Sequence, residues 1–217
     1  MKKILYNKFD KSLLPTLPPA IFGGRIVVVI SEREAEKAVS FLLAQPLLGV
    51  DTETRPSFRK GETNAVSLLQ VATSDVCFLF RLNRIGLCPP IVRLLENTQV
   101  PMVGLSWTDD LMSLHRRGAF TAGLFIDLQN MVGRIGIEDR SLQKLYANIF
   151  GGKISKRQRL SNWDADVLNV KQQQYAATDA WACLRLYEEL LMLEATGNYE
   201  LLKVPEQPLP EPSTSNE

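Results

Sequence analysis

The stretch LLGVDTETRP, residues 47–56, begins as an apolar strand and ends in two carboxylates, and it restricts the possible folds more than any other part of the chain. Side chains alternate between the two faces of a strand, so Asp51 and Glu53 point the same way and Thr52 points the other way. Two ionised carboxylates in one small volume repel each other unless a cation offsets their charge. The stretch predicts either a cation site at the end of a buried strand or a strand that continues as a solvated surface loop.

Length and composition are those of one globular domain. The chain has 217 residues, of which 45% are hydrophobic and 23% are charged, so it is long enough to bury a sizeable core. Its net charge is only +1, which argues against binding nucleic acid through a globally basic surface. Affinity for an anionic polymer would therefore come from a local site.

The three cysteines are widely spaced and form no CxxC pair, so neither a disulfide framework nor a zinc site is indicated. A reducing cytoplasm suits such cysteines. The start, MKKILYNKFDKSLLP, lacks an apolar core of signal-peptide length, and no run approaches the length of a membrane span. We expect a soluble cytoplasmic protein that has no membrane partner.

The pattern of apolar runs and turn residues predicts a proline-containing arm over residues 1–24, one folded domain over 25–196 and a disordered tail over 197–217. Ser31 and Glu34 form a capping box at the start of the first helix, and residues 73–75 separate two strands of a hairpin. The expected fold is α/β, with a mixed central β-sheet flanked by helices. Strands are expected at 24–30, 47–54, 65–72, 76–82 and 100–107, and helices at 31–45, 89–97, 108–118, 124–136, 141–152 and 171–195.

The last long helix carries Tyr175 and Asp179 four residues apart, which places both on one helix face. Ala176, Ala177 and Ala180 surround them, so this part of the helix can approach another surface closely. An aspartate in such an apolar setting is costly to bury without a partner. The alternative is an ordinary tyrosine and aspartate on a helix surface.

A further acidic signal is VGLSWTDDL, where an apolar strand is followed by a helix that Thr108 or Asp109 is expected to cap. The helix dipole alone favours an acid such as Asp110 in a first turn. Together with the acids at the end of residues 47–54 and in the last helix, however, it gives a set of carboxylates that could converge at one sheet edge. Hard cations such as Mg²⁺ or Mn²⁺ require ligands of this kind.

Three motifs, DTE after the apolar strand, the VG strand leading into Asp110, and QYAATDA, resemble those of the DEDD superfamily of 3′–5′ exonucleases in its tyrosine-containing branch. The segment SNWDADVLNVKQQQYAATDAWACLRLYEEL is especially similar to the Werner syndrome exonuclease and RNase D group. The resemblance covers residues 25–193. It implies a ribonuclease-H-like fold and metal-dependent hydrolysis of phosphodiesters from the 3′ end, which releases nucleoside monophosphates.

The resemblance also implies a role for each matching residue. Asp51 would bridge two divalent cations, Mg²⁺ or Mn²⁺. Glu53 and Asp179 would bind the ion that activates water, and Asp110 would hold the second ion. Tyr175 would orient the attacking water, so that no histidine base is needed.

Asp109 stands beside Asp110 and is the alternative ligand, although the spacing from Gly104 and the leucine that follows favour Asp110. The single histidine, His115, is expected to be structural.

The segment GGKISKRQRLSNW, which precedes the last helix, is the candidate for binding the substrate strand. Trp163 could stack on a base or pack the loop onto the core, and the cations could bind phosphates or form a merely solvated loop. Thr52 could contact the terminal nucleotide through its backbone. The expected substrate-binding residues are Thr52, Lys156, Arg159 and Trp163, with Lys153, Arg157, Arg55, Arg59 and Lys60 as further candidates.

The leading hypothesis is an exonuclease that acts on a nucleic acid with a 3′ end, either a single strand or a frayed duplex. The alternatives are a catalytically silent binding or interaction module of the same fold, and a metal-dependent nuclease with a different cut. DNA is slightly favoured over RNA, because the helical domain that RNase D proteins often carry does not fit in the tail. A helicase partner, the oligomeric state and processivity stay open.

Overall fold

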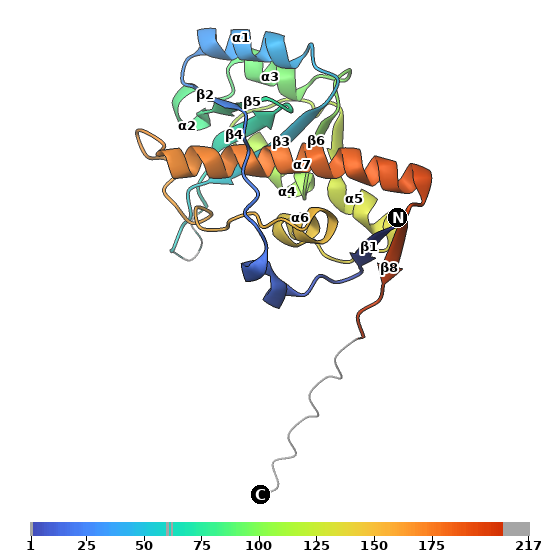
Figure 1. The fold of residues 1–217 in the computed structure, drawn as a ribbon. Helices are drawn as coiled ribbons and strands as arrows, with labels where there is room; N and C mark the ends of the chain where they lie inside the picture. The colour runs from blue at the N-terminus through green and yellow to red at the C-terminus, as the bar shows by residue number, and fades with distance from the viewer. Residues whose placement is uncertain (1, 60, 62, 206–217) are drawn as a thin grey trace, which may run out of the picture.

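The structure is a computed structural model, which describes residues 2–59, 61 and 63–205. A mixed six-stranded sheet forms its centre, in the order β2-β5-β4-β3-β6-β7 (Figure 1). β4 runs antiparallel to both of its neighbours, and the other neighbouring pairs are parallel. The strands are β2 (Arg25–Val29), β3 (Leu48–Thr54), β4 (Val66–Ala72), β5 (Val76–Phe80), β6 (Met102–Gly104) and β7 (Phe125–Asp127).

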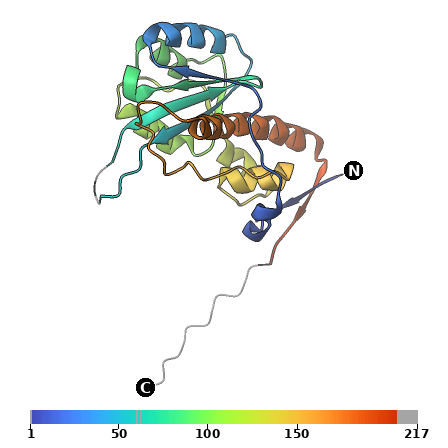
Figure 2. The ribbon, with the colours of Figure 1, turned by 60° about the vertical axis from the view of Figure 1, so that its left-hand side comes forward.

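Helices cover both faces of this sheet. α1 (Glu32–Leu42) and α3 (Pro89–Leu95) pack on one face, and the long α7 (Val170–Thr196) crosses the other (Figures 1 and 2). α6 (Leu142–Phe150) packs against α7 on the side away from the sheet. The shorter helices are α2 (Leu82–Ile85), α4 (Trp107–His115), α5 (Leu128–Val132) and the 3₁₀ helices η1 (Lys11–Thr16) and η2 (Gly133–Ile135). The predicted α/β fold with a mixed, helix-flanked sheet is confirmed.

Local sequence signals explain several element boundaries. The capping box predicted at the start of α1 is present, because the Ser31 side chain accepts from the Glu34 backbone and the Glu34 side chain accepts from the Ser31 backbone. Asn169 and Gln172 form a second capping box at the start of α7. Thr73 lies at the turn between β4 and β5, where its hydroxyl oxygen accepts from Val76 N at 3.0 Å.

The segment after β6 differs from the prediction. α4 begins at Trp107 with Ser106 as its cap residue, so the predicted caps Thr108 and Asp109 lie inside the helix. Ser106 makes no capping hydrogen bond; its backbone N–H and that of Trp107 donate instead to the Asp127 carboxylate, both at 3.0 Å. The helix predicted at residues 124–136 is in fact the edge strand β7 followed by α5 and η2.

The N-terminal arm and the beginning of the predicted tail pair with each other. β1 (Lys3–Tyr6) and β8 (Tyr199–Leu202) form a parallel two-stranded sheet, and Leu5 is fully buried. The predicted boundary at 196 is therefore wrong for residues 199–202, which are ordered as a strand. Residues 206–217 of the predicted tail lie outside the described residues.

A close approach between α7 and the sheet fixes the position of the long helix. A Cβ added to Gly49 in β3 would lie 2.1 Å from the Ala180 carbonyl oxygen, so only glycine fits there. Ala176 and Ala177 of α7 are also fully buried. Small residues on both sides therefore bring the helix backbone close to β3. Within the described part of the chain, no helix is long and apolar enough to span a membrane.

Candidate active site

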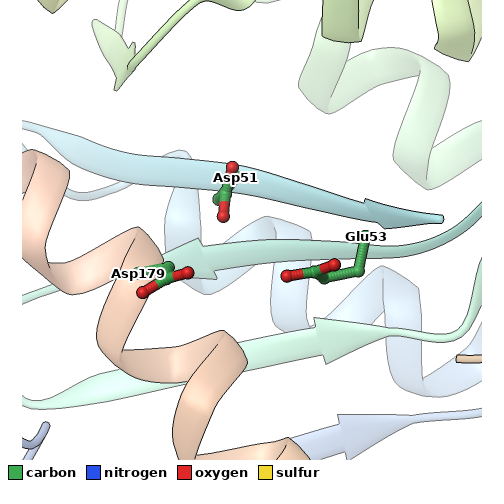
Figure 3. Close-up of side chains that lie close together, drawn as sticks. All are labelled: Asp51, Glu53 and Asp179. Atoms are coloured by element: carbon green, nitrogen blue, oxygen red, sulfur yellow. The ribbon is translucent and has the colours of Figure 1, made fainter. Parts of the chain in front are cut away.

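Three carboxylates converge where β3 meets α7. The structure brings one ligand atom each from Asp51, Glu53 and Asp179 to within 4.8 Å of one another (Figure 3). Asp51 and Glu53 extend from the same face of β3, as strand alternation predicts, and Asp179 reaches them from α7. The expectation that the acids of residues 47–54 and those of the last helix meet at one place is thus confirmed.

The electrostatics of this cluster fit a cation. Burial, then the neighbouring charges of Asp179 and Asp110, hold the pKa of Asp51 well above its usual range. Burial, then the charge of Asp51, raises the pKa of Glu53 to about 10, and burial raises that of Asp179 to about 7. Asp179 Oδ1 is buried and has no hydrogen-bond partner among the residues that the structure describes. A divalent cation would satisfy this oxygen and offset the charges, so the cluster is consistent with a divalent metal site.

Asp110 lies beside this cluster rather than within it. The Thr52 hydroxyl donates to Asp110 Oδ1, which ties α4 to β3. Burial raises the pKa of Asp110 to about 6, whereas Asp109 is exposed to solvent. The geometry therefore favours Asp110 over Asp109 as the acid near the site.

Tyr175 lies one helical turn before Asp179 and interacts with its carboxylate through the phenolic hydroxyl. Burial and the neighbouring Asp179 and Glu53 charges raise the pKa of Tyr175 far above its usual range. The phenol is therefore neutral at any physiological pH. It can donate or accept a hydrogen bond at the cluster, but it cannot act as a phenolate base.

Two of the predicted strand-binding cations lie near the acids. The positive charges of Arg159 and Lys156 lower the pKa of Glu53 and of Asp179, respectively, and so partly offset the rise that burial causes. Both cations belong to the loop before α7 and are exposed. Arg55 and Arg59 lie exposed in the loop after β3, and the candidate Lys60 lies outside the described residues.

Trp163 is not a stacking platform for a base, so this part of the prediction is wrong. Its side chain is fully buried, within the cluster of residues between α7 and the sheet. Its ring centroid lies 6.0 Å from that of Tyr175. The alternative, that Trp163 packs the loop onto the core, is the one the structure bears out, and the packing also supports the Tyr175 ring.

Sequence reasoning missed two side chains that shape the site. Gln70 in β4 lies directly opposite Asp51 in the strand register, is fully buried, and has no partner for either amide atom within the described part of the chain. Asp127 fixes the start of α4, and with it Asp110. An amide in the mostly apolar run VSLLQVA was a visible signal for Gln70. No local signal marks Asp127, because its role depends on pairing between β6 and β7.

Thr52 also acts in a way the sequence did not predict. Its side chain holds Asp110, whereas the expectation concerned a backbone contact to the terminal nucleotide. That backbone contact stays a prediction.

Comparison with known proteins decides the family. The sequence model of a family described as 3′-5′ exonuclease matches residues 26–193, which contain all four acids and Tyr175. The chain belongs to the 3′–5′ exonuclease family. The exonuclease family consists of phosphodiester hydrolases, and the resemblance to its DEDD members that the sequence motifs indicated is confirmed.

Relatives in the exonuclease family match most of the chain. The mouse bifunctional 3′-5′ exonuclease/ATP-dependent helicase WRN is 29% identical over 212 residues, which cover 93% of the chain and 15% of the relative. A 3′-5′ exonuclease of Arabidopsis thaliana is 29% identical over 189 residues, covering 80% of the chain and 66% of the relative. The chain thus spans 15% and 66% of the length of these two proteins.

Solved structures of the exonuclease family share the fold. The Nibbler EXO domain of Aedes aegypti superposes with a TM-score of 0.70 at 21% identity, over 88% of this chain and 93% of that one. Escherichia coli RNase D gives a TM-score of 0.70 at 18% identity, over 81% and 46% of the two chains. These likenesses agree with the predicted ribonuclease-H-like fold.

Proposed function

We propose that this chain is a metal-dependent 3′–5′ exonuclease that hydrolyses phosphodiester bonds from the 3′ end of a nucleic acid and releases nucleoside monophosphates. The convergence of Asp51, Glu53 and Asp179, with a buried unpartnered oxygen on Asp179, is the observation that carries the proposal. Membership of the exonuclease family supports it.

The residues that would hold two divalent cations, Mg²⁺ or Mn²⁺, are the three clustered carboxylates and the adjacent Asp110. Bound cations would lower the pKa of water and offset the charge on the attacking and leaving oxygens of the phosphate. The positions of these carboxylates are fixed by β3, α7 and α4.

The side chains around the acids have separate tasks. The neutral Tyr175 hydroxyl would orient the attacking water beside Asp179. Lys156 and Arg159, exposed next to the acids, would bind the phosphates of the substrate strand.

DNA and RNA are both candidate substrates. The sequence expectation slightly favours DNA, and the mouse relative combines an exonuclease with a helicase. Escherichia coli RNase D, in contrast, is an exoribonuclease that processes structured RNA, and an RNase D of Trypanosoma brucei has been solved in complex with RNA. The sugar preference is therefore part of the experiment.

The experiment is digestion of 5′-labelled DNA and RNA strands with Mg²⁺ or Mn²⁺, resolved on a gel. We expect a ladder that shortens from the 3′ end and disappears in EDTA and in the Asp51→Ala, Glu53→Ala double variant. Intact strands under every metal condition, with strand binding retained, would make the protein a silent binding module.

A matched pair of variants tests the second cation position. Asp110→Asn should lower the rate strongly, because Asp110 is held beside the acids by Thr52. Asp109→Asn removes the same charge from an exposed neighbour and should leave the rate close to that of the parent. The reverse order of effects would assign the position to Asp109.

A further inference from the structure

A basic hollow of about 420 Å³ lies between the N-terminal arm, the start of α6 and the loop before α7. η1 and α6 lie side by side in both views of the ribbon (Figures 1 and 2). The cationic residues that line the hollow come from all three segments: Lys11, Arg140, Lys144 and Lys156. The three segments are distant in sequence, so the fold itself gathers these charges.

Packing and hydrogen bonds hold the arm against α6. Leu14 of η1 and Ala147 of α6 are buried in one apolar cluster. The buried Asp139 carboxylate accepts from Phe9 N at 2.6 Å and from Lys144 Nζ at 2.9 Å. The wall that carries Lys144 is therefore fixed to the arm.

The loop before α7 is fixed to both other walls. Gln143 Nε2 donates to the Ile154 carbonyl at 2.6 Å, which joins the loop to α6. Lys153 donates to the arm twice, through its backbone to the Pro18 carbonyl at 2.8 Å and through Nζ to the Pro15 carbonyl at 3.1 Å. The hollow is thus built before any ligand binds.

The charges of the hollow are only partly offset. Lys144 is paired with Asp139, and Asp10 on the arm accepts from Ser12 N. Within the part of the chain that the structure describes, Lys11, Arg140 and Lys156 form no ion pair, and all three are exposed. Several unpaired cations around one concave site favour an anion there.

Lys156 connects the hollow to the candidate active site. Burial lowers its pKa, and the like charges of Arg159 and Lys11 lower it further, while Asp179 acts in the opposite direction. Lys156 lines the hollow, and its two neighbours in the loop, Ser155 and Arg157, line a second pocket together with Tyr175 of the candidate site. An anionic polymer bound at the acids would meet the basic hollow next.

We propose that the basic hollow binds a backbone phosphate of the substrate strand, upstream of the nucleotide being removed. The proposal rests on the proposed function, because it takes the strand end to lie at the acids. The family match begins at residue 26, so Lys11 adds to the site a contact from outside the matched region. The arm would then have a direct part in holding the substrate.

The test compares Lys11→Gln, Arg140→Gln with a control, Arg33→Gln, Lys37→Gln, which removes two exposed cations from α1 on the opposite face of the sheet. Binding of fluorescent DNA and RNA strands is measured by anisotropy in Ca²⁺ or EDTA, so it does not depend on cleavage. A dinucleotide is compared with a strand several times longer, and the melting temperature of each variant is recorded.

We expect the Lys11→Gln, Arg140→Gln variant to bind the long strand about three- to tenfold more weakly, with a salt dependence lowered by about 0.7 per lost phosphate contact. The Kd of the dinucleotide and the cleavage rate at saturating substrate should stay unchanged, because neither residue touches the reacting group. An unchanged Kd for the long strand, or an equal loss in the α1 control, would overturn the proposal. Intact binding through the hollow without cleavage in Mg²⁺ or Mn²⁺ would overturn the proposed function alone.

Discussion

Asp179 is a carboxylate that is energetically costly to bury and that belongs to the candidate cation site. It lies among buried alanines of α7, and one of its oxygens has no partner among the described residues. An ionised carboxylate in such a place costs several kcal/mol unless a charge or donor compensates it. The raised pKa values of the cluster therefore favour its protonated form when no cation is bound.

This state predicts a pH dependence of stability without metal. The folded-state pKa of Asp179, about 7, and that of Glu53, about 10, lie above their ordinary values of 3.8 and 4.5. The folded protein binds more protons than the unfolded chain at neutral pH, so stability falls as pH rises from about 4 through these values. Melting temperatures in EDTA should decline from pH 5.5 to pH 9, and added Mg²⁺ or Mn²⁺ should raise them more at higher pH. The Asp51→Asn, Asp179→Asn variant should show a flatter profile, and an equal slope in this variant would contradict the assignment.

A substitution at Tyr175 tests whether its hydroxyl positions the attacking water. Tyr175→Phe keeps the ring that packs near Trp163 but removes the hydroxyl that interacts with Asp179. We expect kcat to fall on the order of 10²-fold, the cost of losing one preplaced hydrogen-bonding group, with little change in KM. The matched control is Tyr187→Phe, a partly buried tyrosine further along α7, which should leave both constants unchanged. Equal kcat values for the two variants would remove Tyr175 from the mechanism.

At the scale of elements, the contact between β3 and α7 determines whether the acids meet at all. Asp51 and Glu53 belong to the strand, Asp179 belongs to the helix, and Gly49 lets the two backbones approach. Any change in their separation moves Asp179 relative to the other two carboxylates. The affinity for a divalent cation should therefore depend on how closely α7 packs against β3.

Gly49→Ala tests this coupling. Because the added Cβ would meet the Ala180 carbonyl at 2.1 Å, α7 must shift, at a cost of about 1–3 kcal/mol in unfolding free energy. The affinity for Mn²⁺, followed by calorimetry, should fall with it. Gly133→Ala is the control, because that glycine has a helical φ of −63° and an added Cβ would meet nothing within 4 Å. Equal Mn²⁺ affinity in parent and Gly49→Ala would show that the packing does not govern the site.

The elements that could be predicted are those with strong local signals. A capping box and helical periodicity located α1, and turn residues located the hairpin of β4 and β5. The helix predicted at residues 171–195 is α7, although its capping box was not predicted. β1, β7 and β8 have three or four residues each and pair with partners elsewhere in the chain, so their own sequences do not determine them. Spacing likewise predicted which acids share a face. Whether Trp163 faces a substrate or the core depends on tertiary packing, and the sequence could not decide it.

For the whole molecule, the pairing of β1 with β8 joins the two ends of the described chain. Leu5 is fully buried in the cluster that also contains residues of α5, α6 and α7. The arm is therefore part of the domain core rather than an appendage, although the family match does not include it.

Leu5→Ala measures this contribution. The substitution leaves a cavity in a closed cluster and should cost about 2–5 kcal/mol in unfolding free energy. Ile4→Ala on the same strand is the control, because Ile4 is 45% exposed and its truncation should change stability by only about 0.5 kcal/mol. Chemical denaturation of both variants provides the measurement. Similar losses in the two would mean that β1 contributes only through its backbone pairing.

Because β1 pairs with β8, the order in which the strands are synthesised differs from the order in which they pair. Lys3 is synthesised well before its strand partner, Tyr199, which follows every acid of the site and Tyr175. A nascent chain that has just completed α7 already contains the full set of catalytic candidates, while its first strand still waits for β8. Contacts between residues so far apart in sequence form late, because the long intervening chain must be ordered first. A translation product that stops short of residue 199 would carry every acid of the site with its first strand unpaired.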